Sequence, residues 1–120
     1  MGFLDRFRKE SEALSPSDGD ALILAQLRSA GADLTRPRHV VHYTYVPDEH
    51  RARAAASAIS AAGHDTRVGE RLPGYETWSV IAETTAIVDA TTVVPTRATL
   101  EGIAAEHDGE YDGWEAAATP

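Results

Sequence analysis

The feature of this sequence that most constrains its fold is a strand-like run that gives way abruptly to a helix-like run. Residues 38–46 (RHVVHYTYV) are rich in β-branched and aromatic side chains, which is typical of a β-strand. Pro47, Asp48 and Glu49 then follow in the order of a helix start, with proline early and acids in the first turn. The next segment predicts a helix that ends near Gly63 and packs closely on a sheet through a stripe of small side chains: Ala52, Ala55, Ala56, Ile59 and Ala62.

The other segments complete an α+β pattern. A first helix is predicted over residues 20–30, with Asp18 and Asp20 at its start, and Gly31 ends it. The remaining elements are a polar edge strand over 64–72, a turn at Pro73-Gly74, a strand over 77–88, a cap region over 89–92, a helix over 95–107 with Leu100, Ile103 and Ala104 inward, and a last strand over 110–117. After the first helix this order is β-α-β-β-α-β. It predicts a ferredoxin-like sandwich with an added N-terminal helix, in which two helices cover one face of a four-stranded sheet.

The 120-residue length fits a single domain, which we expect over residues 18–117. Residues 1–17 are expected to form a flexible tail. Contact of residues 1–9 with a membrane or a partner is the alternative, because three apolar side chains lie there at helical spacing beside basic ones, but an isolated helix of about two turns is marginal. No apolar run approaches the roughly 20 residues that cross a bilayer, and no signal-peptide pattern opens the chain, so a cytoplasmic protein is expected.

Charge narrows the class of partner. The formal net charge is −8, and a chain of that charge repels the phosphates that a general nucleic-acid-binding protein must neutralise. The acids are concentrated near the C-terminus, where residues 101–120 hold six of them and no Lys or Arg. This cluster indicates either a solvated surface that keeps the protein soluble or a surface that attracts a basic protein partner.

No constellation for chemistry is present. The chain has no cysteine, which removes thiolate nucleophiles and sulfur-ligated metals, and Lys9 is its only lysine. Of the five histidines, His39 and His42 are three apart in a predicted strand, so they point to opposite faces and cannot bind one ion together. Glu83 is expected as a lone acid on the open sheet face. There is no GxSxG, P-loop or GxGxxG motif, so we predict no catalytic residue, no metal site and no cofactor.

The aromatic residues of the first and last strands are the more informative set. Tyr43 and Tyr45 face one way on the first strand, and Tyr111 and Trp114 lie on the last, which is its neighbour in a ferredoxin-like sheet. Gly113 is a candidate for a bulge that turns one of these rings. Either the rings pack under the helices, or they form an exposed patch on the open face. Exposed aromatic side chains edged by acids suit a protein partner better than RNA.

Three segments of the sequence carry a resemblance to a known family. GDALILAQLRSAGADLTRPRHVVHYTYVPDE, the alanine-rich helix ending in AAGHD, and GEYDGWEAA are together similar to the regulator of ribonuclease E activity B family, over about residues 18–117. The segments HYTYVPDE and EYDGWE are the most specific. The resemblance implies a ferredoxin-like domain that binds ribonuclease E and inhibits it without chemistry of its own.

The sequence therefore predicts a non-catalytic regulator that docks an acidic and aromatic surface on a basic protein partner, with ribonuclease E as the candidate. The expected contact residues are Asp108, Glu110, Asp112, Glu115, Trp114, Tyr43 and Tyr45. Two alternatives stay open. One is a ferredoxin-like small-molecule-binding protein or enzyme, marked by a pocket that holds His42 or Glu83 among converging polar groups. The other is an interaction module for an unrelated partner.

Overall fold

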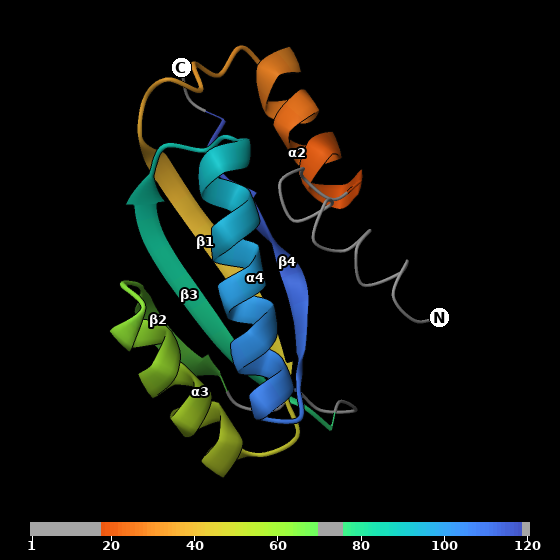
Figure 1. The fold of residues 1–120 in the computed structure, drawn as a ribbon, viewed down its shortest axis with the longest axis vertical. Helices are drawn as coiled ribbons and strands as arrows, with labels where there is room; N and C mark the ends of the chain where they lie inside the picture. Colours follow the sequence, from red (N-terminus) through yellow and green to blue (C-terminus); the bar gives the residue numbers. More distant parts are fainter. Residues whose placement is uncertain (1–17, 70–75, 119–120) are drawn as a thin grey trace, which may run out of the picture.

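The computed structural model describes residues 18–69 and 76–118 of the chain (Figure 1). The elements are α2 (Asp18–Ser29), β1 (Arg38–Val46), α3 (Glu49–Ala61), β2 (Asp65–Gly69), β3 (Trp78–Ala86), α4 (Ala90–Glu106) and β4 (Glu110–Ala116). The predicted tail over 1–17 and the predicted turn at Pro73-Gly74 lie outside the described residues. Within them, the predicted order of elements is confirmed, and the least strongly patterned segment does form an edge strand, β2.

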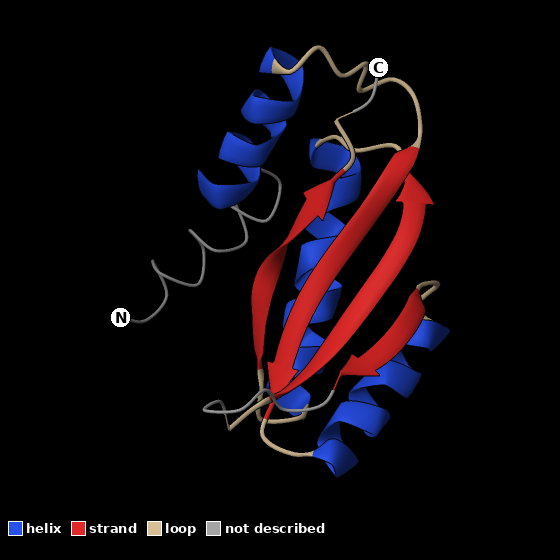
Figure 2. Cartoon of the chain, turned by 180° about the vertical axis from the view of Figure 1, so that it is seen from behind, coloured by secondary structure: helices blue, strands red, loops and turns tan. Residues whose placement is uncertain are grey.

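The four strands form one antiparallel sheet in the order β2-β3-β1-β4. Helices α3 and α4 lie on one face of this sheet, and α2 lies beside β4 (Figure 1). Figure 2 shows the sheet from behind, where none of these helices covers it. The fold is thus the expected α+β ferredoxin-like sandwich with an added N-terminal helix, and one sheet face is left uncovered.

Alternation along the strands sorts the side chains between the two faces. On β1, the alternate residues His42, Thr44 and Val46 point to the helices and are buried, as a two-residue period requires. The main core joins both helices to the sheet and consists of Val46, Ala52, Ala55, Ala56, Ile59, Val80, Ala82 and Leu100. A second cluster lies under α2 and consists of Leu24, Leu27, Val40, Val88, Val93 and Trp114. The odd-numbered residues of β1 are consequently left on the uncovered face.

Helix α3 begins as the sequence predicts. Asp48 is its N-cap, and the carboxylate accepts a hydrogen bond of 2.8 Å from the backbone N–H of Arg51. The predicted alanine stripe is buried except for Ala62, which is exposed. The prediction for Ala62 was wrong because the helix ends at Ala61, so residue 62 is already the C-cap and no longer follows the helical period.

Helix α4 begins at Ala90, five residues before the predicted start at Pro95. A capping box decides the start: the Asp89 side chain accepts from the backbone N–H of Thr92, and the Thr92 hydroxyl accepts from the N–H of Asp89. Pro95 therefore lies inside the helix, where its ring removes one backbone donor. The earlier start adds Val93 and Val94 to the buried face.

A bulge interrupts the pairing of β4 with β1, as Gly113 suggested. Gly113 lies opposite Tyr43, whereas the next residue of β1, Thr44, lies opposite Tyr111, so one residue of β4 is extra. Gly113 has a φ of 114°, a backbone conformation that side-chain-bearing residues rarely adopt. Tyr111 and Trp114 are three positions apart, and in a regular strand that odd spacing would put them on opposite faces. The extra residue corrects the alternation, so both rings point to the helix side.

Candidate protein-interaction surface

The uncovered side of the sheet, called the open face from here on, is built from three rows of side chains that run across the strands. Cross-strand pairing gives the rows Asp65-Glu83-Val41-Glu115, Arg67-Ile81-Tyr43-Gly113 and Gly69-Ser79-Tyr45-Glu110. Neighbours within a row that carry side chains have Cβ atoms about 5 Å apart, whereas Gly113 and Gly69 add no side chain at the ends of the second and third rows. His39 adds to the face at the end of β1 next to the first row.

The centre of the open face is aromatic and half-buried. Tyr43 lies between Ile81 and Gly113, and Tyr45 lies between Ser79 and Glu110. The Tyr43 hydroxyl donates a hydrogen bond of 2.6 Å to Oε1 of Glu115, and this bond raises the pKa of the tyrosine. The ring of Tyr43 is therefore held in one orientation on the surface by its hydroxyl end.

Carboxylates dominate the charge of the open face. The three rows hold four acids against one guanidinium: Asp65, Glu83, Glu110 and Glu115 against Arg67. Arg67 Nη2 lies 3.2 Å from Glu83 Oε1, and His39 Nε2 lies 3.7 Å from the same oxygen. With histidine neutral, the face keeps a net negative charge around its aromatic centre.

The structure divides the residues that the sequence proposed for partner binding. Tyr43, Tyr45, Glu110 and Glu115 lie together on the open face. The other three lie elsewhere. Asp108 is in the turn before β4, where its Oδ2 accepts a hydrogen bond of 3.0 Å from Arg51 Nε. Asp112 is in the bulge, and Trp114 is buried under α2 with 5% of its surface exposed. Each of the two alternatives for the aromatic residues therefore applies to one strand. The tyrosines of β1 lie on the open face, and the rings of Tyr111 and Trp114 on β4 pack on the helix side.

Sequence reasoning did not name Asp65, Arg67 or Ile81 among the contact residues. They come from β2 and β3, whose register against β1 is a tertiary property. The available signal is alternation on β3, which puts Ser79, Ile81 and Glu83 on the face opposite to the buried Val80 and Ala82. Nothing in the local pattern says which of them lies opposite Tyr43.

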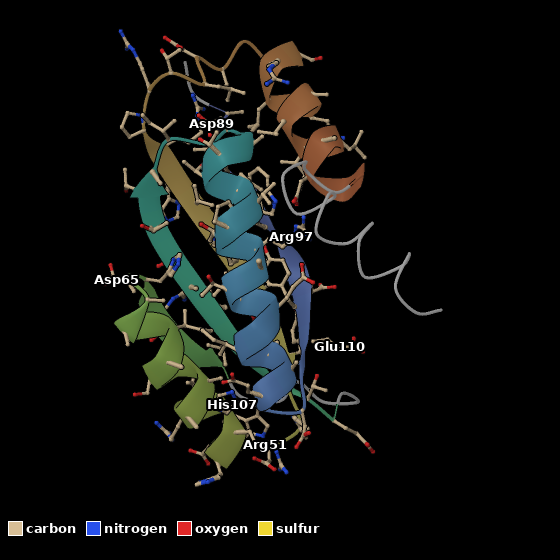
Figure 3. The ribbon with its side chains drawn as sticks, in the orientation of Figure 1. Arg51, Asp65, Asp89, Arg97, His107 and Glu110 are labelled. Carbon is tan, nitrogen blue, oxygen red and sulfur yellow. The ribbon has the colours of Figure 1, made fainter. Side chains whose placement is uncertain are left out.

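A cleft, called the α2 cleft from here on, lies where α2 meets α4 and β4. This cleft has a volume of about 410 Å³, and its lining includes Asp20, Arg97 and Trp114. Asp20 is buried, and it accepts hydrogen bonds from Trp114 Nε1 at 2.8 Å and Arg97 Nε at 2.5 Å. Arg97, on the side of α4 that faces α2 and β4 (Figure 3), also donates to Glu101 at 2.7 Å. These polar groups satisfy one another, so the cluster fastens α2 to the domain.

His42 lies on the helix side of the sheet, away from both surfaces. Its Nδ1 is 2.8 Å from the hydroxyl of Tyr111, and its ring meets that of His64 edge-on with centroids 5.6 Å apart. Burial, assisted by His64, lowers the pKa of His42 to about 4, so the ring is neutral at pH 7. Because His39 is on the open face, the prediction that these two histidines face opposite ways is confirmed.

No group of three or more His, Asp or Glu suited to a metal ion occurs in residues 18–69 and 76–118. The α2 cleft is lined by neither His42 nor Glu83, the residues that would mark the small-molecule alternative. In the same part of the chain, the helices are too short and too polar to cross a membrane.

Comparison with known protein families bears directly on this arrangement. The family model described as regulator of ribonuclease activity B matches residues 17–116. The chain belongs to the regulator of ribonuclease activity B family. The match spans every described element from α2 to β4, so the open face and the Asp20-Arg97-Trp114 cluster both lie inside the region that the family shares. A search of curated proteins found no match to this chain.

Proposed function

We propose that this protein is a non-catalytic regulator that inhibits a ribonuclease of the ribonuclease E type by binding it through the open face. The observation that carries the proposal is the uncovered sheet face, on which Tyr43 and Tyr45 form an aromatic centre bordered by Glu110 and Glu115. Family membership supports a ribonuclease as the target. The open face refines the predicted acidic surface to one side of the sheet.

The composition of the face favours a basic protein segment as its partner. Tyrosine provides contact area at low conformational cost and is enriched in the centres of protein interfaces. RNA-binding sheets place basic residues around such aromatic rings, whereas Tyr43 and Tyr45 are bordered mainly by carboxylates. A second copy of the same face would bring like charges together, which disfavours self-association.

The inhibitory step follows from charge. A ribonuclease holds RNA by Lys and Arg contacts to phosphates. When the carboxylates of the open face pair with such side chains, they occupy the groups that would otherwise hold RNA or bind other partners of the enzyme. Inhibition of this kind needs no bond breaking by the regulator.

Three charge-matched double variants test the proposal against purified ribonuclease E. Glu110→Lys/Glu115→Lys alters the open face, Asp108→Lys/Asp112→Lys alters the turn and the bulge, and Glu49→Lys/Glu106→Lys alters exposed positions on α3 and α4. We expect the first double to weaken binding by about tenfold or more, the equivalent of about 1.4 kcal/mol, and to reduce the salt dependence of affinity.

The same experiment separates the competing outcomes. Equal weakening by all three doubles would show that net charge alone matters, and an unchanged affinity of the first double would exclude the open face. Inhibition of RNA cleavage by each variant should follow the order of binding. If ribonuclease E does not bind the wild-type protein at all, the regulator has another partner.

A further inference from the structure

We propose that one row of the open face forms a subsite for a single arginine side chain of the partner, between Glu83 and Glu115 and across Val41. This inference rests on the proposed function, because it takes a basic protein as the partner. The subsite identifies the group that the partner contributes, a guanidinium, and the residues that bind it, Glu83 and Glu115.

The arrangement begins with two glutamates that flank one valine. Glu83 and Glu115 are the two cross-strand neighbours of Val41, so their Cα atoms are about two strand spacings, or roughly 10 Å, apart. Asp65 follows Glu83 in the same row. Like charges so close to one another repel, and a cation between the glutamates would relieve the repulsion.

A hollow lies beside this row. It has a volume of about 230 Å³ and is lined by His39, Val41, Glu115, Ala116 and Ala117. Pockets that hold a whole small molecule are usually about 300–1,000 Å³, so this hollow suits one long side chain better. Val41, with 8% of its surface exposed, gives the hollow an apolar contact for the methylene groups of a basic side chain.

Both glutamates keep acceptor capacity, and Glu115 also lines the hollow. Every contact that these two carboxylates make with described residues falls on Oε1: Glu115 Oε1 accepts from the Tyr43 hydroxyl, and Glu83 Oε1 faces Arg67 and His39. Each Oε2 is therefore left for an incoming donor. A carboxylate can accept from more than one donor, so binding an arginine does not require the existing contacts to break.

The geometry favours arginine over lysine. A guanidinium offers five N–H donors in a planar fork, so it can donate to two carboxylates on opposite sides, while an ammonium is a compact point charge. Tyr43, fixed by its bond to Glu115, presents a ring beside the subsite on which a guanidinium can stack. The neighbouring row thus adds an aromatic wall to the two acids.

Binding of a small probe, without the ribonuclease, tests the subsite. The probes are acetylated, amidated Gly-Arg-Gly and its counterparts with lysine or citrulline, the last being a neutral shape-matched control for arginine. We expect NMR titration to shift the Val41 methyl and Glu115 amide signals most with arginine, less with lysine and not with citrulline. Equal shifts with citrulline, or arginine shifts confined to other parts of the protein, would overturn the inference.

Variants provide the second readout. Glu115→Gln and Glu83→Gln should each weaken arginine-peptide binding by about tenfold, as expected for loss of a charge-assisted hydrogen bond. Glu106→Gln, an exposed position on α4, should change it less than twofold. If Glu110→Lys weakens ribonuclease binding but Glu83→Gln and Glu115→Gln change neither ribonuclease nor peptide binding, the subsite is refuted and the proposed function stands. If no open-face variant affects ribonuclease binding, the proposed function fails as well.

Discussion

Asp20 Oδ1 accepts a hydrogen bond of 2.8 Å from Nε1 of Trp114, which joins the first described helix to the last strand across 94 positions of sequence. The other carboxylate oxygen, Oδ2, binds Arg97 of α4. One buried acid thus connects α2, α4 and β4, the three elements around the α2 cleft. The added helix is therefore part of the folded domain and leaves the open face uncovered.

Replacing Asp20 tests this joint. Asp20→Ala should lower the free energy of unfolding by about 2–3 kcal/mol, because the partly buried Arg97 keeps only Glu101 as a carboxylate partner and the buried Trp114 N–H loses its acceptor. Asp20→Asn, which keeps an acceptor for the indole, should cost less. Urea unfolding followed by tryptophan fluorescence measures both, and equal stability of Asp20→Ala and wild type would refute the role of the joint.

Two glycines near the end of α4 should respond to alanine in opposite ways. A Cβ at Gly109 would lie 2.2 Å from the Tyr45 carbonyl oxygen and 2.6 Å from Val46 Cγ1, so Gly109→Ala should destabilise the fold by about 3 kcal/mol or more. A Cβ at Gly102 meets nothing within 4 Å, and Gly102→Ala inside the helix should stabilise it by about 0.5–1 kcal/mol. Thermal unfolding of the two variants checks both signs, and loss of stability in both would contradict the contrast.

The buried His42 should make the protein sensitive to acid. Its folded pKa of about 4 is below the ordinary value of 6.5, so the unfolded chain binds more protons between these values. The free energy of unfolding should therefore fall as the pH decreases from about 6.5 to about 4, by about 3 kcal/mol from this residue alone. The groups that set this pKa are His64, which lowers it further, and Asp20, which opposes the shift.

Urea unfolding at a series of pH values measures that slope. His42→Phe, which replaces the imidazole by an apolar ring, should flatten the slope between pH 6.5 and 4, whatever it does to stability at pH 7. His50→Gln, at an exposed position on α3, is the control and should leave the slope unchanged. A His42→Phe variant with the wild-type slope would show that other groups cause the acid sensitivity.

The capping box of α4 should be a measurable source of stability. Asp89→Ala removes the acceptor for the Thr92 N–H and should cost about 1–2 kcal/mol, whereas Asp89→Asn, also a good N-cap, should cost a few tenths. Thr92→Val removes the reciprocal half of the box and should fall between them. Thermal unfolding of the three variants gives the order, and an Asp89→Ala protein as stable as wild type would show that α4 does not depend on its cap.

The elements that the sequence predicted well are those with a strong local signal. The strand 38–46 and a helix start near residues 47–49 were predicted correctly, because β-branched and aromatic content and the order of proline and acids are properties of neighbouring residues. The start of α4 was predicted too late because proline is common at the first position of a helix, which favoured Pro95. The capping box formed by Asp89 and Thr92 starts the helix earlier, at Ala90. Four of the seven residues expected at the interface, all from β1 and β4, lie together on the open face.

The sequence by itself determined which residues of β1 and β3 share a face, since alternation in an unbroken strand is fixed by backbone geometry. It also determined the excess of acids and, through family membership, the class of protein. Only the tertiary structure decided which rows form across the strands. Cross-strand register and the bulge at Gly113 depend on packing between segments far apart in the chain, so Trp114 became part of the core while Tyr43 and Glu115 met on the surface.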